Sequence, residues 1–278
     1  MRRWHAFYEK AVTLLVAIVV SLLAFIWLFP FVWSFISSLK SPAEIAADIW
    51  SLPGRMYWEN YADAFGGLSY TRSLGNSLFV ASAAAALQCV TGTLAAFAFA
   101  RMHFPGREVL FMLFLATLMI PTTVTLTANF LILQGLGWID TYLALIIPMA
   151  ASGFAIFLLR QFFMTIPLEL EEAARIDGAG RLKFLWHVVI PLSRPALVTV
   201  FVFIFITNYN EFLWPLIMTT SPEIRVIQIS LSIFSDALGV GDFGVLMAAA
   251  ILTLLPTIIL FAFLQQAFVR GITRTGLK

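Results

Sequence analysis

Six long apolar runs, separated by short polar connections, dominate the amino-acid sequence. They cover residues 11–35, 73–100, 109–133, 141–163, 195–218 and 243–268. Each run is about long enough for a helix to cross the roughly 30 Å hydrocarbon core of a bilayer. The pattern therefore predicts an all-α, polytopic membrane protein with six transmembrane helices. Because the number of spans is even, both termini are expected on the same side of the membrane.

Basic residues are distributed unevenly around these runs, and this predicts an orientation. Of the 17 Lys and Arg residues, 13 lie in the two tails and in the second and fourth loops. The four on the other side are Lys40, Arg55, Arg72 and Arg225. Lys and Arg near span ends are retained on the cytoplasmic side. We therefore predict cytoplasmic termini and a cytoplasmic fourth loop. The first run is too long for a signal peptide, and we interpret it as a retained anchor.

Composition supports a membrane protein and argues against several other classes. Hydrophobic residues make up 61% of the chain and charged residues only 12%, more apolar surface than a soluble core buries. A net charge of +2 with dispersed basic residues does not favour nucleic-acid binding. The single cysteine, Cys89, excludes an internal disulfide, and His5, His103 and His187 lack metal-ligand spacing. We therefore predict no metal site, and a single transmembrane domain over residues 1–278.

Two longer loops lie on the predicted outer side, over residues 37–72 and 219–242. The first carries an aromatic set that suits either the lipid interface or a docked partner. Its members are Trp50, Tyr57, Trp58, Tyr61 and Tyr70.

The cytoplasmic loop over residues 164–194 begins with a predicted short helix. Pro167 is expected at its first position and Gly178 at the left-handed position beyond its end. Carboxylates in the first turns oppose the positive helix terminus; they are Glu169, Glu171 and Glu172. Glu171 and Arg175 form a favourable i, i+4 pair. Such a helix can stand outside the bilayer.

The rest of this loop predicts a contact surface and a second short helix. Ala173 and Ala174 leave a flat patch that another protein can approach closely. After a bend at residues 178–180, an apolar stripe is expected to rest on the membrane domain until Pro191 ends it. The stripe consists of Leu182, Leu185, Trp186 and Val189. Periodicity alone fits an ordinary amphipathic connector equally well.

The spacing of residues in this loop resembles the EAA loop of bacterial ABC-importer permeases. Glu172-Ala173-Ala174 is followed after three residues by Gly178, and after nine more by Val188-x-Ile190-Pro191. The family writes this segment as EAA, three residues, Gly, nine residues and Ile-x-Leu-Pro. Other segments are similar to the maltose-type carbohydrate permeases within that family. They are Arg72-Ser73-Leu74-Gly75-Asn76-Ser77, the Gly137 to Tyr142 segment, Tyr209-Asn210-Glu211-Phe212-Leu213-Trp214-Pro215 and the tail over residues 270–278.

This resemblance implies a type I ABC importer permease fold in which the EAA helix couples to an ATPase. The implied coupling residues are Glu172, Ala173, Ala174 and Gly178. The carboxylate would bond to the ATPase, the alanines would permit close docking, and the glycine would set the bend. None of the four lysines lies in a G-x-x-x-x-G-K-[ST] motif. This chain is therefore not expected to be an enzyme or to hold a cofactor, and ATP and Mg²⁺ are expected on the partner.

The resemblance also implies an assembly in the bacterial plasma membrane. Its other members are an ABC ATPase dimer, a second permease that forms a heterodimer with this chain, and an extracytoplasmic solute-binding protein. The implied solute is a sugar or a sugar-like molecule. Glycerol phosphates, oligosaccharides, amino sugars and polyols all stay open.

A polar cluster in the fifth apolar run is a candidate for the translocation pathway. It consists of Asn208, Tyr209, Asn210 and Glu211. An ionisable residue inside a span is energetically costly and is a functional candidate for that reason. Alternatively, Glu211 lies toward the outer end and bonds only to a neighbouring helix or to water. Both interpretations stay open at this point.

Proline and small residues predict local features of the other runs. Pro121 and Pro148 predict kinks in the third and fourth helices, and packing that tolerates proline explains them equally well. The alanines over residues 81–86, together with Gly92, predict close helix packing.

Two other classes of protein compete with a permease. A secondary transporter would need its own coupling-ion site, for which one Glu is thin support. A membrane enzyme would need converging catalytic groups, which the sequence does not show.

Overall fold

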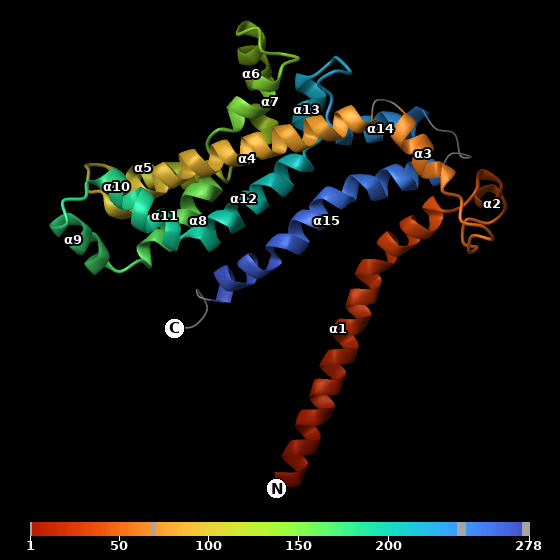
Figure 1. Cartoon of the computed structure of the whole chain (residues 1–278), viewed down its shortest axis with the longest axis horizontal. Coiled ribbons are helices and arrows are strands. Elements are labelled where there is room, and N and C mark those ends of the chain that lie inside the picture. The colour runs from red at the N-terminus through yellow and green to blue at the C-terminus, as the bar shows by residue number, and fades with distance from the viewer. Residues whose placement is uncertain (1, 68–69, 238–242, 274–278) are drawn as a thin grey trace. The chain divides into compact units, whose positions relative to one another are not determined.

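The computed structural model describes residues 2–67, 70–237 and 243–273, and these residues form helices and no strands (Figure 1). The all-α prediction is thereby confirmed. The chain divides into two compact units, Met1–Leu68 with Leu231–Leu254, and Ser69–Ser230 with Leu255–Lys278. The divisions in the second half of the chain fall inside two helices, α14 and α15. The prediction of one transmembrane domain over residues 1–278 stays a prediction.

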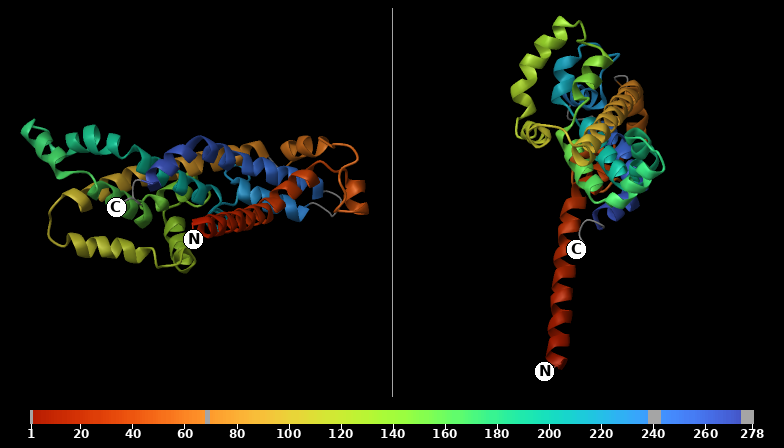
Figure 2. Two further views of the ribbon diagram at one scale, coloured as in Figure 1. Left: turned by 90° about the horizontal axis from the view of Figure 1, so that it is seen from below. Right: turned by 90° about the vertical axis from the view of Figure 1, so that its left-hand side faces the viewer.

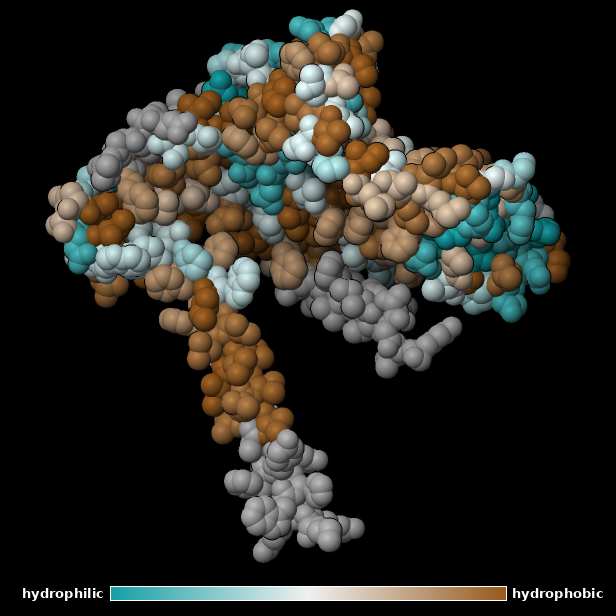
Figure 3. Space-filling view, turned by 180° about the vertical axis from the view of Figure 1, so that it is seen from behind, coloured by the Kyte–Doolittle hydropathy of each residue, from teal (hydrophilic) through white to brown (hydrophobic). Residues whose placement is uncertain are grey.

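The first unit is built around a long apolar helix. Its elements are α1 (Arg2–Ser38), α2 (Pro42–Ala47), α3 (Glu59–Gly66), the later part of α14 (Ile227–Ala237) and the first part of α15 (Phe243–Thr273). The most apolar window within Val12–Ser38 has no residue buried inside the chain, and its apolar side chains cover the helix surface in Figure 3. In an integral membrane protein, lipid or another subunit must cover such a surface.

The loop that follows α1 is folded around a buried lysine. Lys40 is fully buried, donates from Nζ to the carbonyl oxygen of Ile49 at 2.6 Å, and lies 4.5 Å above the Trp33 ring. Asn60 Nδ2 donates to the carbonyl oxygens of Ser38 and Lys40 at 2.9 and 2.8 Å. Burial lowers the pKa of Lys40, although nearby carboxylates oppose that shift. This lysine is therefore part of the loop's core.

The second unit contains the segments with the most informative sequence. Its elements are α4 (Tyr70–Arg101), α5 (Arg107–Thr117), α6 (Thr122–Gly135), α7 (Tyr142–Ile146), η1 (Ile147–Met149), α8 (Gly153–Met164), α9 (Leu168–Ile176), α10 (Arg181–Phe184), η2 (Leu185–Val189), α11 (Ile190–Leu192), α12 (Arg194–Tyr209), α13 (Leu213–Met218), the first residues of α14 and the end of α15. α4 packs along α8 and α12 (Figure 1).

Small residues bring α4 close to its neighbours, as the sequence predicted. Ala81, Ala84 and Ala85 are completely buried. A Cβ atom added to Gly92 would lie 2.9 Å from the Cβ atom of Ala155 on α8. Close helix contact of this kind is typical of membrane proteins, where small side chains let backbones approach.

Several apolar runs form bent pairs of helices. α5 and α6 meet at 96° where Pro121 precedes α6 (Figure 2). The helices on either side of the fourth run's break meet at 41°, and Pro148 lies in η1 directly before that break. The kinks predicted at these prolines are confirmed. Within the part of the chain that the structure describes, three helices are long and apolar enough to span a membrane, or up to six if each bent pair is one span.

The fifth run is not one helix over residues 195–218, so that part of the prediction is wrong. α12 ends at Tyr209 and α13 begins at Leu213. Side-chain amides compete with the backbone here, because Asn208 and Asn210 each donate to a carbonyl oxygen four residues back. Glu211 then accepts a hydrogen bond from the backbone N–H of Trp214 at 3.3 Å. The helix therefore breaks at the polar cluster.

Polar side chains at the start of α4 hold the segment that leads into α14. Asn76 Nδ2 donates to the carbonyl oxygens of Glu223 and Arg225, both at 2.9 Å, and Tyr142 Oη donates to Asn76 Oδ1 at 2.7 Å. The hydroxyls of Ser73 and Ser230 lie 2.7 Å apart. The family-like segments at residues 72–77 and 137–142 thus meet in one network.

Candidate coupling loop and solute cavity

α9 is a nine-residue helix with a defined start and end. Pro167 immediately precedes it, so this proline is at the cap and not at the first helical position that the sequence predicted. Gly178 has φ +73°, the left-handed conformation expected past the helix end. Its N–H donates to the carbonyl oxygen of Arg175 at 3.0 Å, and Ala179 N–H donates to that of Ala174 at 2.8 Å. These two bonds are the Schellman motif that commonly ends a helix.

The predicted coupling residues lie together on α9 and at its end. Glu172, Ala173 and Gly178 are exposed, and Ala174 is half-buried. Ile176 is 87% exposed and lies three residues after Ala173, on the same face. Polar residues gather around α9 and α10 in Figure 3. The exposed surface of α9 is therefore acidic at its start and small or apolar near its end.

A buried arginine from α4 anchors the start of α9. Arg101 Nη2 donates to the carbonyl oxygen of Phe163 at 2.6 Å and to that of Ile166, and Nη1 lies 3.6 Å from Glu171 Oε2. Only 4% of the Arg101 side chain is exposed. Glu171 Oε1 also lies 3.8 Å from Arg175, which confirms the predicted i, i+4 pair. The sequence indicated the local pair but not the contact across 70 residues.

A second ionic contact ties α8 to α5 near the same end. Arg160 Nη2 lies 3.3 Å from Glu108 Oε2, and the Arg160 guanidinium lies 4.0 Å above the ring of Phe111. Arg160 Nε also donates to the carbonyl oxygen of Phe99 on α4 at 3.3 Å. The helices around the coupling loop are thus joined by two buried arginines.

The second half of the loop differs from the predicted amphipathic helix. α10 continues through the π-helical turn η2 into α11, so Pro191 lies inside a helical segment and does not end it. Leu185 and Val189 are fully buried, but Leu182 and Trp186 are 65% and 59% exposed. The wider π turn rotates successive side chains away from the spacing of a regular α-helix. The predicted stripe therefore splits, and only half of it packs inside.

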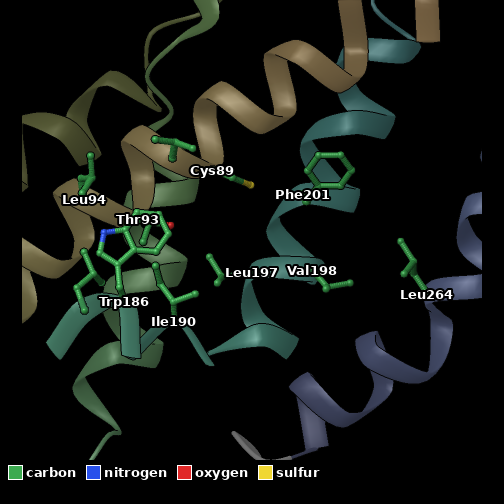
Figure 4. A pocket seen from close by; sticks show the side chains of 11 residues that line it. Cys89, Thr93, Leu94, Trp186, Ile190, Leu197, Val198, Phe201 and Leu264 are labelled. Atoms are coloured by element: carbon green, nitrogen blue, oxygen red, sulfur yellow. The ribbon is translucent and has the colours of Figure 1, made fainter. Parts of the chain in front are cut away.

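Trp186 lines an apolar groove of about 460 Å³ between α4, α12 and the segment formed by η2 and α11 (Figure 4). The groove extends from Cys89 and Leu94 on α4 to Phe201 on α12 and Leu264 on α15. Its lining is apolar apart from Thr93 and Cys89, so it suits hydrocarbon and not a polar solute.

A different, smaller cavity contains two of the four predicted pathway residues. It measures about 180 Å³ and is bordered by Gln88, Asn208 and Glu211 together with mostly apolar side chains. Tyr209 is buried instead, with its ring stacked 5.8 Å from that of Phe205, and Asn210 is exposed outside the cavity lining. The break after α12 thus divides the predicted cluster.

Gln88 is the cavity residue that sequence reasoning did not identify. It lies in the middle of α4, and 7% of its surface is exposed. A polar amide inside an apolar run could have identified it. Among the described residues, no group of three or more His, Cys, Asp or Glu could hold a metal ion.

The sequence over residues 88–274 matches the family of binding-protein-dependent transport system inner membrane components. The chain belongs to this family and is a permease subunit of an ABC importer. This assignment favours a permease over the two competing classes, a secondary transporter and a membrane enzyme.

Relatives cover nearly the whole chain. The sn-glycerol-3-phosphate transport system permease protein UgpE of Brucella abortus (strain 2308) is 38% identical over 256 residues, which cover 89% of this chain and 91% of that protein. UgpE of Yersinia pestis bv. Antiqua (strain Antiqua) is 35% identical over 253 residues, covering 88% and 90%. The predicted membership of the ABC-importer permeases is therefore confirmed.

Solved structures show the same fold. A chain of a bacterial ABC transporter involved in the import of the acidic polysaccharide alginate has a TM-score of 0.84 and 25% identity, covering 94% of this chain and 97% of that chain. A chain of an alginate ABC transporter in complex with an alginate pentasaccharide-bound periplasmic protein has a TM-score of 0.64 and 16% identity, covering 90% and 92%. The second match shows the fold alone.

Proposed function

We propose that α9 is the coupling helix through which a separate ABC ATPase dimer drives this permease. The observation that carries the proposal is the exposed face of α9, where Glu172 and Ala173 stand free while Arg101 and Gly178 fix the two ends of the helix. A rigid helix with an accessible acidic and small-residue face suits insertion into a cleft of another protein. ATP and Mg²⁺ are bound by that partner, and this chain holds no cofactor.

The exposed apolar surface of α1 and the family of the chain support the other members of the proposed assembly. We infer six crossings, with each bent pair as one span, in the plasma membrane of a bacterium. The uneven distribution of Lys and Arg supports cytoplasmic termini and a cytoplasmic α9. α1 is unburied within its own chain over its most apolar window, so a second, related permease is a fitting partner for that surface. An extracytoplasmic solute-binding protein docks on the outer loops. The description of the family as binding-protein-dependent supports that partner.

The solute of this permease is a sugar or a sugar-like molecule. Relatives named for glycerol 3-phosphate and for alginate support small or polymeric hydroxyl-bearing solutes. Asn208 and Glu211 line the pathway, and Tyr209 and Asn210 support it from the helix break. The polar cavity supports this assignment because its hydrogen-bonding groups suit hydroxyls.

Copurification of the ATPase tests the coupling helix. Glu172→Lys reverses a charge on the exposed face and is expected to weaken ATPase retention at least about tenfold, because close charge pairs across interfaces contribute strongly. Glu59→Lys, a reversal on a half-exposed residue of the first loop, is the matched control and should retain the ATPase. Equal retention in both variants would contradict the role of α9.

Two substitutions at Gly178 test whether the shape of the helix end matters. Gly178→Val must hold φ +73°, which costs about 1–2 kcal/mol for a residue with a Cβ atom, whereas Asn tolerates this conformation. No atom lies within 4 Å of the added Cβ, so crowding does not contribute. Gly178→Asn should therefore couple nearly normally while Gly178→Val loses most transport. Loss of function in both, or in neither, would contradict the role of this conformation.

A further inference from the structure

The cavity beside Gln88 contains polar groups that the protein itself leaves without partners. Gln88 is more than nine-tenths buried, borders the cavity, and its side-chain amide has no hydrogen bond to any described residue. The amide atoms are not among the fully enclosed side-chain atoms without a partner in the described residues, so they face the open space of the cavity and can bond to a molecule within it.

Two further polar residues of the cavity present acceptor oxygens to it. Glu211 Oε1 accepts from the Trp214 backbone N–H, which leaves Oε2 without a partner among the described residues. Asn208 uses one Nδ2 hydrogen to donate to the carbonyl oxygen of Ile204 at 2.8 Å, which leaves its Oδ1 and its second Nδ2 hydrogen for a bound molecule. A molecule that satisfies these oxygens must bring hydrogen-bond donors.

The charge of the cavity has a single sign. Glu211 is the one charged side chain among its twelve lining residues, and none of these is Lys, Arg or His. Much of the lining is apolar, including Leu126, Leu145 and Met149. An apolar surrounding strengthens the repulsion between the carboxylate and an anion. The solutes named for the relatives, glycerol 3-phosphate and the acidic polysaccharide alginate, are both anionic.

We propose that this cavity is a binding subsite for a solute that carries hydroxyl donors and no negative charge, such as a neutral sugar. The inference rests on the proposed sugar-importing function and narrows its substrate class. At about 180 Å³ the cavity is smaller than a complete small-molecule pocket, so it takes one part of the solute. Phosphorylated and acidic sugars are excluded by Glu211.

Thiol chemistry measures the cavity's charge directly and does not depend on transport. Cys89→Ala removes the single native cysteine. A new thiol is then introduced into the cavity lining by Gln88→Cys or, in a second variant, by Thr207→Cys, and each variant is studied in the full assembly. The rates of reaction with a cationic and an anionic methanethiosulfonate reagent are then compared. Glu211→Gln is expected to lower the cation-to-anion rate ratio at least about fivefold, because one nearby charge acts oppositely on the two reagents.

Glu223→Gln is the matched control, since it removes an exposed carboxylate that does not line the cavity. It should leave the ratio unchanged. A ratio insensitive to Glu211→Gln at both cysteine positions, or one equally sensitive to Glu223→Gln, overturns the proposal.

Protection of the same thiol identifies the solute class. Glucose is expected to slow labelling at least about twofold, and glucose 6-phosphate, which differs by its phosphate, is expected to slow it less. Equal or better protection by the phosphate, or no protection by either sugar, overturns the proposal. Copurification of the ATPase is scored separately in the same preparations, so failure of coupling and failure of the solute assignment remain distinguishable.

Discussion

Arg101 is the residue that joins the start of α9 to the longest helix of the second unit. Its side chain reaches two backbone carbonyl oxygens and one carboxylate from a position at the last residue of α4. The planar guanidinium can serve several acceptors at once, which a lysine ammonium on a flexible stem does less precisely. A displacement of α9 is therefore expected to act on α4, which carries Gln88 in its middle.

Replacement of this arginine should separate ATP hydrolysis from transport. Arg101→Lys keeps the charge but loses the simultaneous contacts, and we expect transport to fall about tenfold while ATP hydrolysis by the assembly continues. Hydrogen bonds to a charged group contribute roughly 1.5–3 kcal/mol each, enough for such an effect. Transport and ATP hydrolysis are measured together in proteoliposomes.

Arg175→Gln is the matched control for this variant. It removes the other partner of Glu171, and the Arg175 side chain is 79% exposed. Exposed ion pairs contribute little, so transport should change less than about twofold. Wild-type transport in Arg101→Lys, or an equal loss in both variants, would show that the anchor is not involved in coupling.

Asp140 is a second residue with a testable local role. Its backbone has φ +62°, and its Oδ1 accepts hydrogen bonds from Thr220 N–H and Ser221 N–H, both at 2.9 Å. The Ser221 N–H is the main reason that the pKa of Asp140 lies below its ordinary value of 3.8. The resulting stability is present above that ordinary value and is lost as the pH falls through the lowered pKa.

Asp140→Asn should therefore lower stability by about 1 kcal/mol at pH 7 and reduce the acid sensitivity of this loop junction. Asn tolerates the left-handed backbone, so the charge is what changes. Thermal unfolding of the purified protein between pH 7 and pH 3 measures both effects. Asp63→Asn, in the first unit, should leave the pH profile unaltered; an identical profile for Asp140→Asn would contradict this explanation.

At the scale of elements, the packing of α4 on α8 depends on the absence of a side chain at Gly92. Gly92→Ala would place a Cβ atom 2.9 Å from that of Ala155, a distance that requires the helices to shift. Overpacking of this kind typically costs about 1–3 kcal/mol. We expect a lower thermal unfolding midpoint in detergent.

Gly75→Ala, in the same helix, is the matched control. No atom lies within 4 Å of its added Cβ, so the gain in helix propensity should leave stability unchanged or raise it by up to about 1 kcal/mol. A midpoint that falls equally in both variants would mean that helix contact at Gly92 is not the cause.

Elements were predictable from sequence where their causes are local. The kinks follow from Pro121 and Pro148, the end of α9 follows from Gly178, and close packing follows from the alanines of α4. The break after Tyr209 was missed, because it arises from asparagine side chains that bond backward inside an apolar run. Hydropathy treats such a run as continuous.

Contacts between distant segments were not predictable in the same way. Arg101 counted in the sequence only as a basic residue near a span end, and nothing local pairs it with Glu171. Gln88 is recognisable as a polar residue inside an apolar run, but its neighbours in the sequence do not indicate that α12 and α13 meet α4 at the cavity. One sequence without relatives aligned to it contains no information on such pairs.

At the scale of the whole molecule, the number of crossings and their direction form one prediction. Ile176 on α9 and Trp50 in the first loop are both highly exposed. Each is replaced by cysteine in a separate variant that also carries Cys89→Ala. In intact cells an impermeant thiol reagent should label Trp50→Cys and not Ile176→Cys, while inverted membrane vesicles should show the reverse. Labelling of both from one side would contradict the six-span topology with cytoplasmic termini.

The acidity of α9 has a practical consequence for handling the assembly. Glu169, Glu171 and Glu172 lie within about one turn of α9, and Arg175 is the single basic residue of that helix. Attraction between exposed charges is screened over about 8 Å at physiological ionic strength and over about 3 Å at 1 M salt. High-salt washing of membranes is therefore expected to strip the ATPase from this permease, whereas dilute buffers should preserve the complete transporter.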